Sequence, residues 1–89
     1  MIRVLLAEDQ AMVRGALAAL LRLEGDIEIV AEVARGDEVL SAALKIQPDV
    51  ALLDIGMPGG GGLSAAQVLH ERLPFCRIVI LTTFGRSGY

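Results

Sequence analysis

Three carboxylates follow two apolar segments of the chain, and this pattern has the clearest chemical meaning in the sequence. Glu8 and Asp9 come directly after the apolar run at 2–7, and Asp54 ends the run at 50–53. If the two runs form neighbouring parallel strands, the three side chains meet at one edge of the sheet. Carboxylates about 4 Å apart repel by roughly 4 kcal/mol per pair at an effective dielectric constant near 20. We therefore expect a cation between them, and hard oxygen ligands of this kind suit Mg²⁺.

Each of these acids has a simpler interpretation when it is taken alone. Asp54 could cap the turn after its strand, and Glu8 and Asp9 could begin a helix, where the helix dipole favours carboxylates. Capping does not explain why three carboxylates should reach the same edge of a sheet. The set as a whole therefore favours a metal site, open enough to hold water and a phosphate group beside the ion.

The elements that must position these acids alternate along the chain. Continuous apolar runs predict strands at 2–7, 27–33, 50–54 and 77–83. Amphipathic patterns between the runs predict helices at 10–25, 36–48 and 63–74. Strict alternation of strands and helices predicts right-handed crossovers and a parallel sheet, which is the α/β class.

Capping residues and prolines predict where the helices begin and end. We expect Gly25 to cap the end of the first helix, Asp37 to cap the start of the second, and Pro48 and Pro74 to end the second and third. The apolar stripes are expected to contain Val13, Leu17, Leu20 and Leu21 in the first helix and Val39, Leu40, Ala43 and Leu44 in the second.

The composition limits the class of protein. The chain has 89 residues, of which 54% are hydrophobic, a formal net charge of −3 and a single cysteine, Cys76. A chain of this length forms one small domain at most. The negative charge argues against a nucleic-acid-binding surface, and one cysteine argues against a disulfide framework. Because no segment has the pattern of a signal peptide or a membrane span, we expect a cytoplasmic protein with no membrane contact.

Three segments resemble the signature segments of a known family. They are "LLAEDQ" at 5–10, "PDVALLDIGMPGGGGL" at 48–63 and "IVILTTF" at 78–84. They are similar to the acidic pair, the acceptor aspartate with its Met-Pro loop, and the switch hydroxyl of bacterial response-regulator receiver domains. The order and spacing agree over the whole chain. The motifs "AEDQ…R" and "LTTF…GY" are similar to those of the branch that carries a LuxR/NarL-type helix-turn-helix, which includes the DesR-like regulators.

The resemblance implies a role for each matching residue. Asp54 would accept a phosphoryl group from a sensor histidine kinase. Asp9, Asp54 and the carbonyl of Gly56 would bind Mg²⁺, and Glu8 would hold a water molecule of the metal. Thr82 would turn its hydroxyl onto the phosphoryl group and act as the switch. The domain itself would be regulatory, with at most self-catalysed phosphoryl transfer and dephosphorylation.

The resemblance also implies a fold and a set of partners. The fold would be flavodoxin-like (CheY-like), with a doubly wound parallel sheet in the order 2-1-3-4. Residues 1–89 would form an incomplete receiver domain, without the fifth strand, the last two helices and the transcription domain that binds DNA. The lysine that the family carries on its fifth strand has no counterpart, since Lys45 belongs to the second predicted helix. A homodimer or other self-association is expected, because the strand at 77–83 would be an apolar sheet edge.

Alternative functions depend on particular residues. A phosphatase of the haloacid-dehalogenase type needs an acid two positions after its nucleophile, where this chain has Gly56. The run Gly59–Gly62 lacks the ending of a nucleotide-binding P-loop, so we expect an ordinary loop. His70 is expected to lie on a solvated helix face, and Cys76 to be a small buried hydrophobic residue. The alternative that stays open is a receiver-like interaction module that binds partners without phosphorylation.

Overall fold

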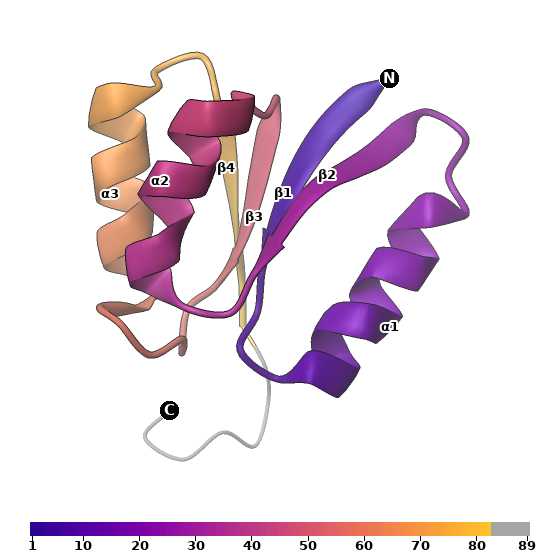
Figure 1. The fold of residues 1–89 in the computed structure, drawn as a ribbon, viewed down its shortest axis with the longest axis horizontal. Coiled ribbons are helices and arrows are strands. Elements are labelled where there is room, and N and C mark those ends of the chain that lie inside the picture. Colours follow the sequence, from indigo (N-terminus) through magenta and orange to yellow (C-terminus); the bar gives the residue numbers. More distant parts are fainter. Residues whose placement is uncertain (83–89) are drawn as a thin grey trace.

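Four parallel strands alternate with three helices in the computed structural model, which describes residues 1–82 (Figure 1). The strands are β1 (Ile2–Ala7), β2 (Ile27–Val33), β3 (Val50–Asp54) and β4 (Arg77–Leu81), and the helices are α1 (Ala11–Arg22), α2 (Gly36–Ile46) and α3 (Gly61–Arg72). The sheet has the order β2-β1-β3-β4, and every neighbouring pair is parallel. The predicted α/β class and the predicted strand order are confirmed.

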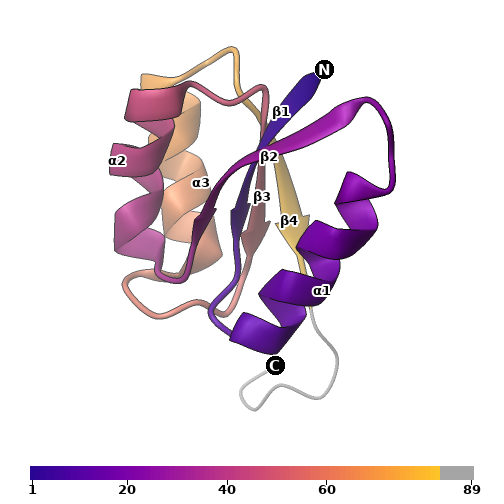
Figure 2. The same cartoon turned by 45° about the vertical axis from the view of Figure 1, so that its right-hand side comes forward.

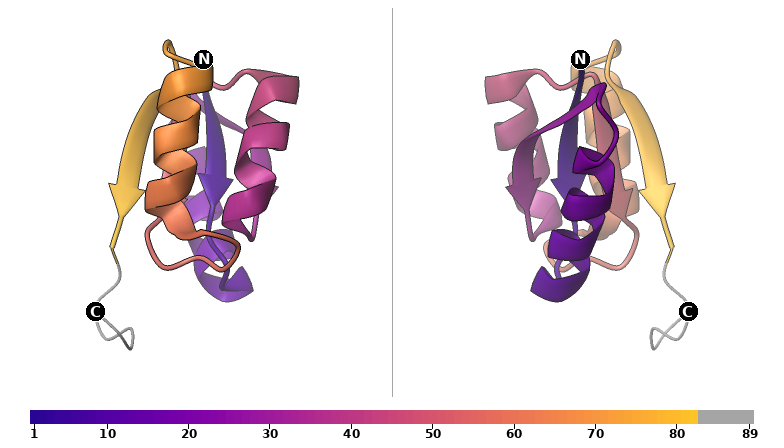
Figure 3. Two further views of the ribbon diagram at one scale, coloured as in Figure 1. Left: turned by 90° about the vertical axis from the view of Figure 1, so that its left-hand side faces the viewer. Right: turned by 90° about the vertical axis from the view of Figure 1, so that its right-hand side faces the viewer.

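The helices form a layer on each face of the sheet. Helices α2 and α3 lie side by side on one face, and α1 lies on the other, towards β2 (Figures 1 and 2). The two views of Figure 3 show β4 at one edge of the molecule, on the side away from α2. Because helices cover both faces of the central strands, those strands are apolar at successive positions.

The core lies between the sheet and the layer formed by α2 and α3. Side chains at alternate positions of β1 and β3 enter it, and residues of the two helices pack against them. The intervening residues of β1, Val4 and Leu6, are also buried, as is Ala18 of α1. The buried residues of the main core are Leu5, Ala7, Val39, Ala43, Ala51, Leu53, Met57, Ala65, Leu69 and Cys76.

Helix α1 presents most of its predicted apolar stripe to the protein, since Val13, Leu17 and Leu21 are half-buried, and Leu20 is the exception. Leu20, expected in the inward stripe, is 62% exposed, whereas Ala18 is buried. Arg14 is half-buried on the same helix, and its guanidinium group contacts Glu8 and Glu32.

Two predicted caps are wrong. Helix α1 ends at Arg22 with Leu23 as its C-cap in right-handed backbone conformation, so Gly25 lies beyond the cap. Helix α2 begins at Gly36, one residue before the predicted cap, which places Asp37 in the first turn. A carboxylate there still interacts favourably with the helix dipole.

The prolines mark the helix ends well, and the glycine run does not behave as a simple loop. Helices α2 and α3 end two residues before Pro48 and Pro74, at Ile46 and Arg72. Helix α3 begins at Gly61, so the last two glycines of the run belong to its first turn. The predicted loop is therefore two residues too long.

None of the helices in residues 1–82 is long and apolar enough to cross a membrane.

Strand β4 is one of the two edge strands of the described sheet, and β2 is the other. Strand β4 pairs with β3 along one side, in a register that places Asp54 beside Leu81. The predicted strand reached residue 83; the observed strand ends at Leu81, Thr82 follows it, and Thr83 lies outside the described residues. Val79 in the middle of the strand is 46% exposed. The expected apolar edge is present within residues 1–82.

Candidate functional site

The three acids that the sequence singles out lie together at the carboxyl ends of the two central strands. Glu8 and Asp9 follow β1, and Asp54 is the last residue of β3. Strands β1 and β3 are neighbours, with Ala7 paired to Leu53. Carboxylate oxygens of the three acids all lie within 4.8 Å of one another. The adjacency of the two strands therefore produces the expected acidic cluster.

Two of these carboxylates are completely shielded from solvent. Glu8 and Asp54 have no exposed area, and Asp9 is half-buried. Burial raises the pKa of the Glu8 carboxyl above its ordinary value, and the proximity of Asp9 and Asp54 raises it further. The N–H of Gln10 opposes this rise by donating a hydrogen bond to Glu8 Oε2 at 2.8 Å. Burial and the neighbouring acids thus disfavour the charged form of Glu8, and a cation beside it would relieve that penalty.

Glycines allow the segment after Asp54 to fold closely around it. The N–H of Gly56 donates a hydrogen bond to Asp54 Oδ1 at 3.2 Å, and the N–H of Gly62 donates one to the carbonyl of Ile55 at 3.3 Å. A Cβ atom on Gly62 would overlap the carbonyl group of Asp54. Only glycine at this position lets the start of α3 approach the backbone of Asp54 so closely.

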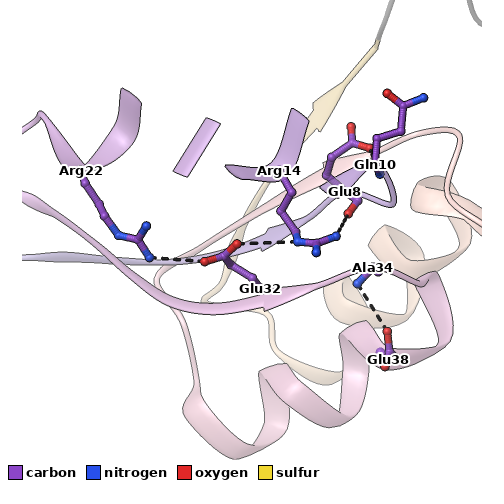
Figure 4. Close-up of polar contacts among 7 residues, drawn as sticks. All are labelled: Glu8, Gln10, Arg14, Arg22, Glu32, Ala34 and Glu38. Carbon is purple, nitrogen blue, oxygen red and sulfur yellow. Dashed lines mark hydrogen bonds and ion pairs between the residues drawn. The ribbon is translucent and has the colours of Figure 1, made fainter. Parts of the chain in front are cut away.

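Arg14 is a residue of the site region that the sequence reasoning did not identify. Its guanidinium group donates a hydrogen bond to the carbonyl of Glu8 at 2.8 Å and lies 3.7 Å from the carboxylate of Glu32 on β2. Glu32 also pairs with Arg22 at 3.3 Å (Figure 4). The sequence does contain a sign that Arg14 is special, because it is the one charged residue between positions 11 and 21. These contacts fix the start of α1 beside the acidic pair.

Thr82 lies at the same edge of the sheet as the acids. It is exposed and follows Leu81, the register partner of Asp54. Its place agrees with the predicted switch position, and the role itself stays a prediction. His70 is exposed on α3 and Cys76 is buried, both as expected. Lys45 lies in the last turn of α2, away from the cluster.

A parallel α/β sheet with three acids at the ends of its central strands defines a class of regulatory domain, and comparison with known proteins names it. The chain matches the response regulator receiver domain over residues 4–89. It therefore belongs to the response-regulator receiver family, as the signature segments predicted.

The two curated relatives compared with this chain are transcriptional regulatory proteins. The chain is 46% identical to the transcriptional regulatory protein YvfU and 48% identical to the transcriptional regulatory protein DesR, both from Bacillus subtilis. Each comparison covers all of this chain and 44% of the relative. The chain thus spans less than half the length of these relatives.

Solved structures agree with the fold and with the predicted branch. A LuxR-family DNA-binding response regulator from Staphylococcus aureus is 36% identical, with a TM-score of 0.88 over 100% of this chain and 74% of that one. The response regulator domain of Thermotoga maritima CheB is 28% identical, with a TM-score of 0.88 over 99% of this chain and 65% of that one. The predicted CheY-like receiver fold and the LuxR-type branch are confirmed.

Proposed function

We propose that this receiver domain accepts a phosphoryl group on Asp54 from the phosphohistidine of a sensor kinase. The observation that carries the proposal is the place of Asp54, a fully buried carboxylate at the end of a central strand with the oxygens of Glu8 and Asp9 within 4.8 Å. Carboxylates form acyl phosphates in enzymes that transfer phosphoryl groups. In this step an Asp54 oxygen bonds to phosphorus, the phosphorus–nitrogen bond of the donor breaks, and the donor nitrogen takes up a proton.

Mg²⁺ fits the donor atoms of the cluster. The cluster consists of carboxylates, which are hard oxygen donors that suit this ion. We assign Asp9, Asp54 and the carbonyl of Gly56 as ligands, and Glu8 as the residue that holds a metal-bound water molecule. When bound, the ion supplies charge neutralisation for the oxygens of the transferred group.

Residues of the chain prepare Asp54 for this reaction. The N–H of Gly56 holds one carboxylate oxygen of Asp54, so the side chain has a fixed orientation at the strand end. Thr82 follows Leu81, the register partner of Asp54, which supports a role as the switch residue. In this role its hydroxyl donates a hydrogen bond to the added phosphoryl group. A hydrogen bond of that kind would shift the backbone that follows β4, and a partner would read the shift.

The proposal extends to the protein that carries this domain. We infer that the 89 residues are the larger part of a receiver domain, and that a following helix-turn-helix domain binds DNA in the cytoplasm. Support comes from the relatives, which are transcriptional regulators more than twice as long as this chain. In this scheme the receiver domain contacts the kinase and does not itself contact DNA.

Labelling by a small phosphodonor tests the proposal. The full-length gene product is incubated with acetyl phosphate, with Mg²⁺ or with a chelator, and its intact mass is measured. We expect one phosphoryl group in the wild type and in the control Asp26→Asn, which changes an exposed acid before β2. We expect none with the chelator or in Asp54→Asn. A phosphoryl group on Asp54→Asn would contradict the assignment, and no labelling at all would favour an interaction module without phosphorylation.

A further inference from the structure

The start of α2 contacts the loop that joins β3 to α3. Gly36, the first residue of α2, is buried, and its N–H donates a hydrogen bond to the carbonyl of Pro58 at 2.8 Å. Pro58 lies two residues after Gly56, whose carbonyl is a proposed metal ligand. Figures 1 and 3 show this loop passing beside the first turn of α2. The hydrogen bond thus connects α2 with the segment that carries this proposed ligand.

The contact leaves no space for a side chain at position 36. A Cβ atom there would lie 2.9 Å from the carbonyl oxygens of Gly59 and Gly61 and 3.1 Å from the nitrogen of Gly61. These neighbours are backbone atoms, which cannot move without moving the loop. Glycine at position 36 is therefore a condition for the observed position of the loop.

The side chain after Gly36 adds to the same contact. Asp37 carries a carboxylate whose Oδ1 would lie 2.8 Å from a Cβ atom on Gly59, which has a φ of +78°. Arg35 holds this carboxylate through two hydrogen bonds of 3.0 and 3.1 Å, and the pKa of Asp37 is lowered by that pairing. The β2–α2 junction thus presents both backbone and a fixed side chain to the loop.

The loop depends on outside contacts because its own sequence restrains it little. Gly59, Gly60 and Gly61 all have positive φ angles, and glycine is the residue with the most backbone freedom. Hydrogen bonds from Gly56 and Gly62 fix the two ends of the loop within its own segment. The bond from Gly36 fixes its middle from another element.

We propose that Gly36 is a positioning residue for the Mg²⁺ site, acting through Pro58 on the loop that carries the Gly56 carbonyl. This inference rests on the proposed function. A side chain at position 36 displaces the loop and thereby the carbonyl ligand. Because coupling between two sites is reciprocal, a metal ion that fixes the loop also strengthens the hydrogen bond from Gly36.

The wild-type full chain gives the first test, by amide hydrogen exchange with and without saturating Mg²⁺. We expect Mg²⁺ to slow exchange at the Gly36 amide. The control is the amide of Gln47, which lies at the other end of α2 and donates to the carbonyl of Ala43 at 2.7 Å. Equal slowing of both amides would mean that the metal merely stabilises the whole domain, and would overturn the inference.

The second test compares Gly36→Ala with Gly15→Ala, a glycine on α1 whose added Cβ meets nothing within 4 Å. Mn²⁺ serves as the probe, and its dissociation constant is measured by electron paramagnetic resonance at a temperature at which circular dichroism shows each variant folded. We expect Gly36→Ala to bind Mn²⁺ at least about tenfold more weakly, the lower end of what supporting residues contribute to metal affinity. Gly15→Ala should bind like the wild type.

The outcomes separate this inference from the proposed function. Wild-type affinity in Gly36→Ala would overturn it even if the variant melts at a lower temperature, because a purely structural glycine affects stability alone. If Gly36→Ala does not fold, the exchange measurement on the wild type decides. Failure of the wild type to bind Mn²⁺ would instead count against the proposed function itself.

Discussion

Glu8 and Asp54 bring two fully buried carboxylates together at the ends of adjacent strands. Folding removes both groups from water, and the raised pKa of Glu8 records the resulting penalty for its charge. Asp9 adds a third oxygen to the same cluster. Since burial and the neighbouring acids disfavour the charge of Glu8, a cation bound among the three carboxylates should increase the free energy of unfolding.

Thermal unfolding in a Mg²⁺ titration measures this stabilisation. A ligand at ten times its dissociation constant contributes about 1.4 kcal/mol, and in a domain of this size each kcal/mol raises the melting temperature by about 4–8 °C. We expect such an increase in the wild type and in Asp26→Asn, and a smaller one in Asp9→Asn. A melting temperature that does not respond to Mg²⁺ would count heavily against the metal site.

Alanine at two glycine positions should have opposite effects on stability. Gly62→Ala places a Cβ atom against the carbonyl of Asp54, and crowding of this kind typically costs about 1–3 kcal/mol. Gly15→Ala lies in open space on α1, where alanine is favoured over glycine by about 1 kcal/mol. Urea unfolding followed by circular dichroism measures both. Equal stability of Gly62→Ala and the wild type would show that α3 can move away from Asp54 at little cost.

Cys76 should react slowly with a thiol reagent in the folded chain. Burial raises the pKa of its thiol, and the negative charge of Asp49 raises it further. Little thiolate therefore forms near pH 8, and the rate should increase as the pH approaches the raised pKa. Because the chain has a single cysteine, Ellman's reagent reports this residue alone. Rapid reaction at pH 8 before the addition of denaturant would show that the start of β4 opens readily.

A polypeptide of these 89 residues should self-associate through β4. This strand is one of the two edge strands of the described sheet, with Val79 46% exposed and apolar neighbours at 78, 80 and 81. The strand begins with Arg77, but residues 78–81 contain no charge or proline that would discourage pairing with another chain. A two-fold dimer is the simplest product.

Sedimentation at micromolar concentration measures the self-association. We expect Val79→Lys to weaken it, and the same substitution at Val68, an exposed valine of α3, to leave it unchanged. A monomeric wild-type polypeptide would contradict the prediction.

The strands and the acidic cluster could be predicted because both follow from local sequence and from one rule of topology. Continuous apolar runs mark strands covered on both faces, and the ends of β1, β2 and β3 agree with those runs. Neighbouring parallel strands end at the same edge of a sheet, so the acids that follow them converge. The order of the strands came from the family resemblance, because apolar patterns alone do not fix it.

Contacts between distant segments account for what the sequence did not predict. Leu20 has the right spacing for the inward stripe of α1 but is exposed, whereas Arg14 of the same helix is half-buried and contacts Glu8 and Glu32. The sequence around Gly36 does not distinguish it from other glycines at helix starts. Its role depends on the backbone of residues 58–61, which packs against it only in the folded chain. No local pattern carries such information.

Chemical mapping of the phosphoryl group tests the central claim, that Asp54 itself is the acceptor. The full-length protein is labelled with acetyl phosphate and Mg²⁺ and then treated with borohydride, which reduces an acyl phosphate of aspartate to homoserine. Peptide mass spectrometry then identifies the residue that changed. We predict homoserine at position 54, with Glu8 and Asp9 intact. Reduction at another acid, with Asp54 unchanged in a labelled sample, would contradict the account.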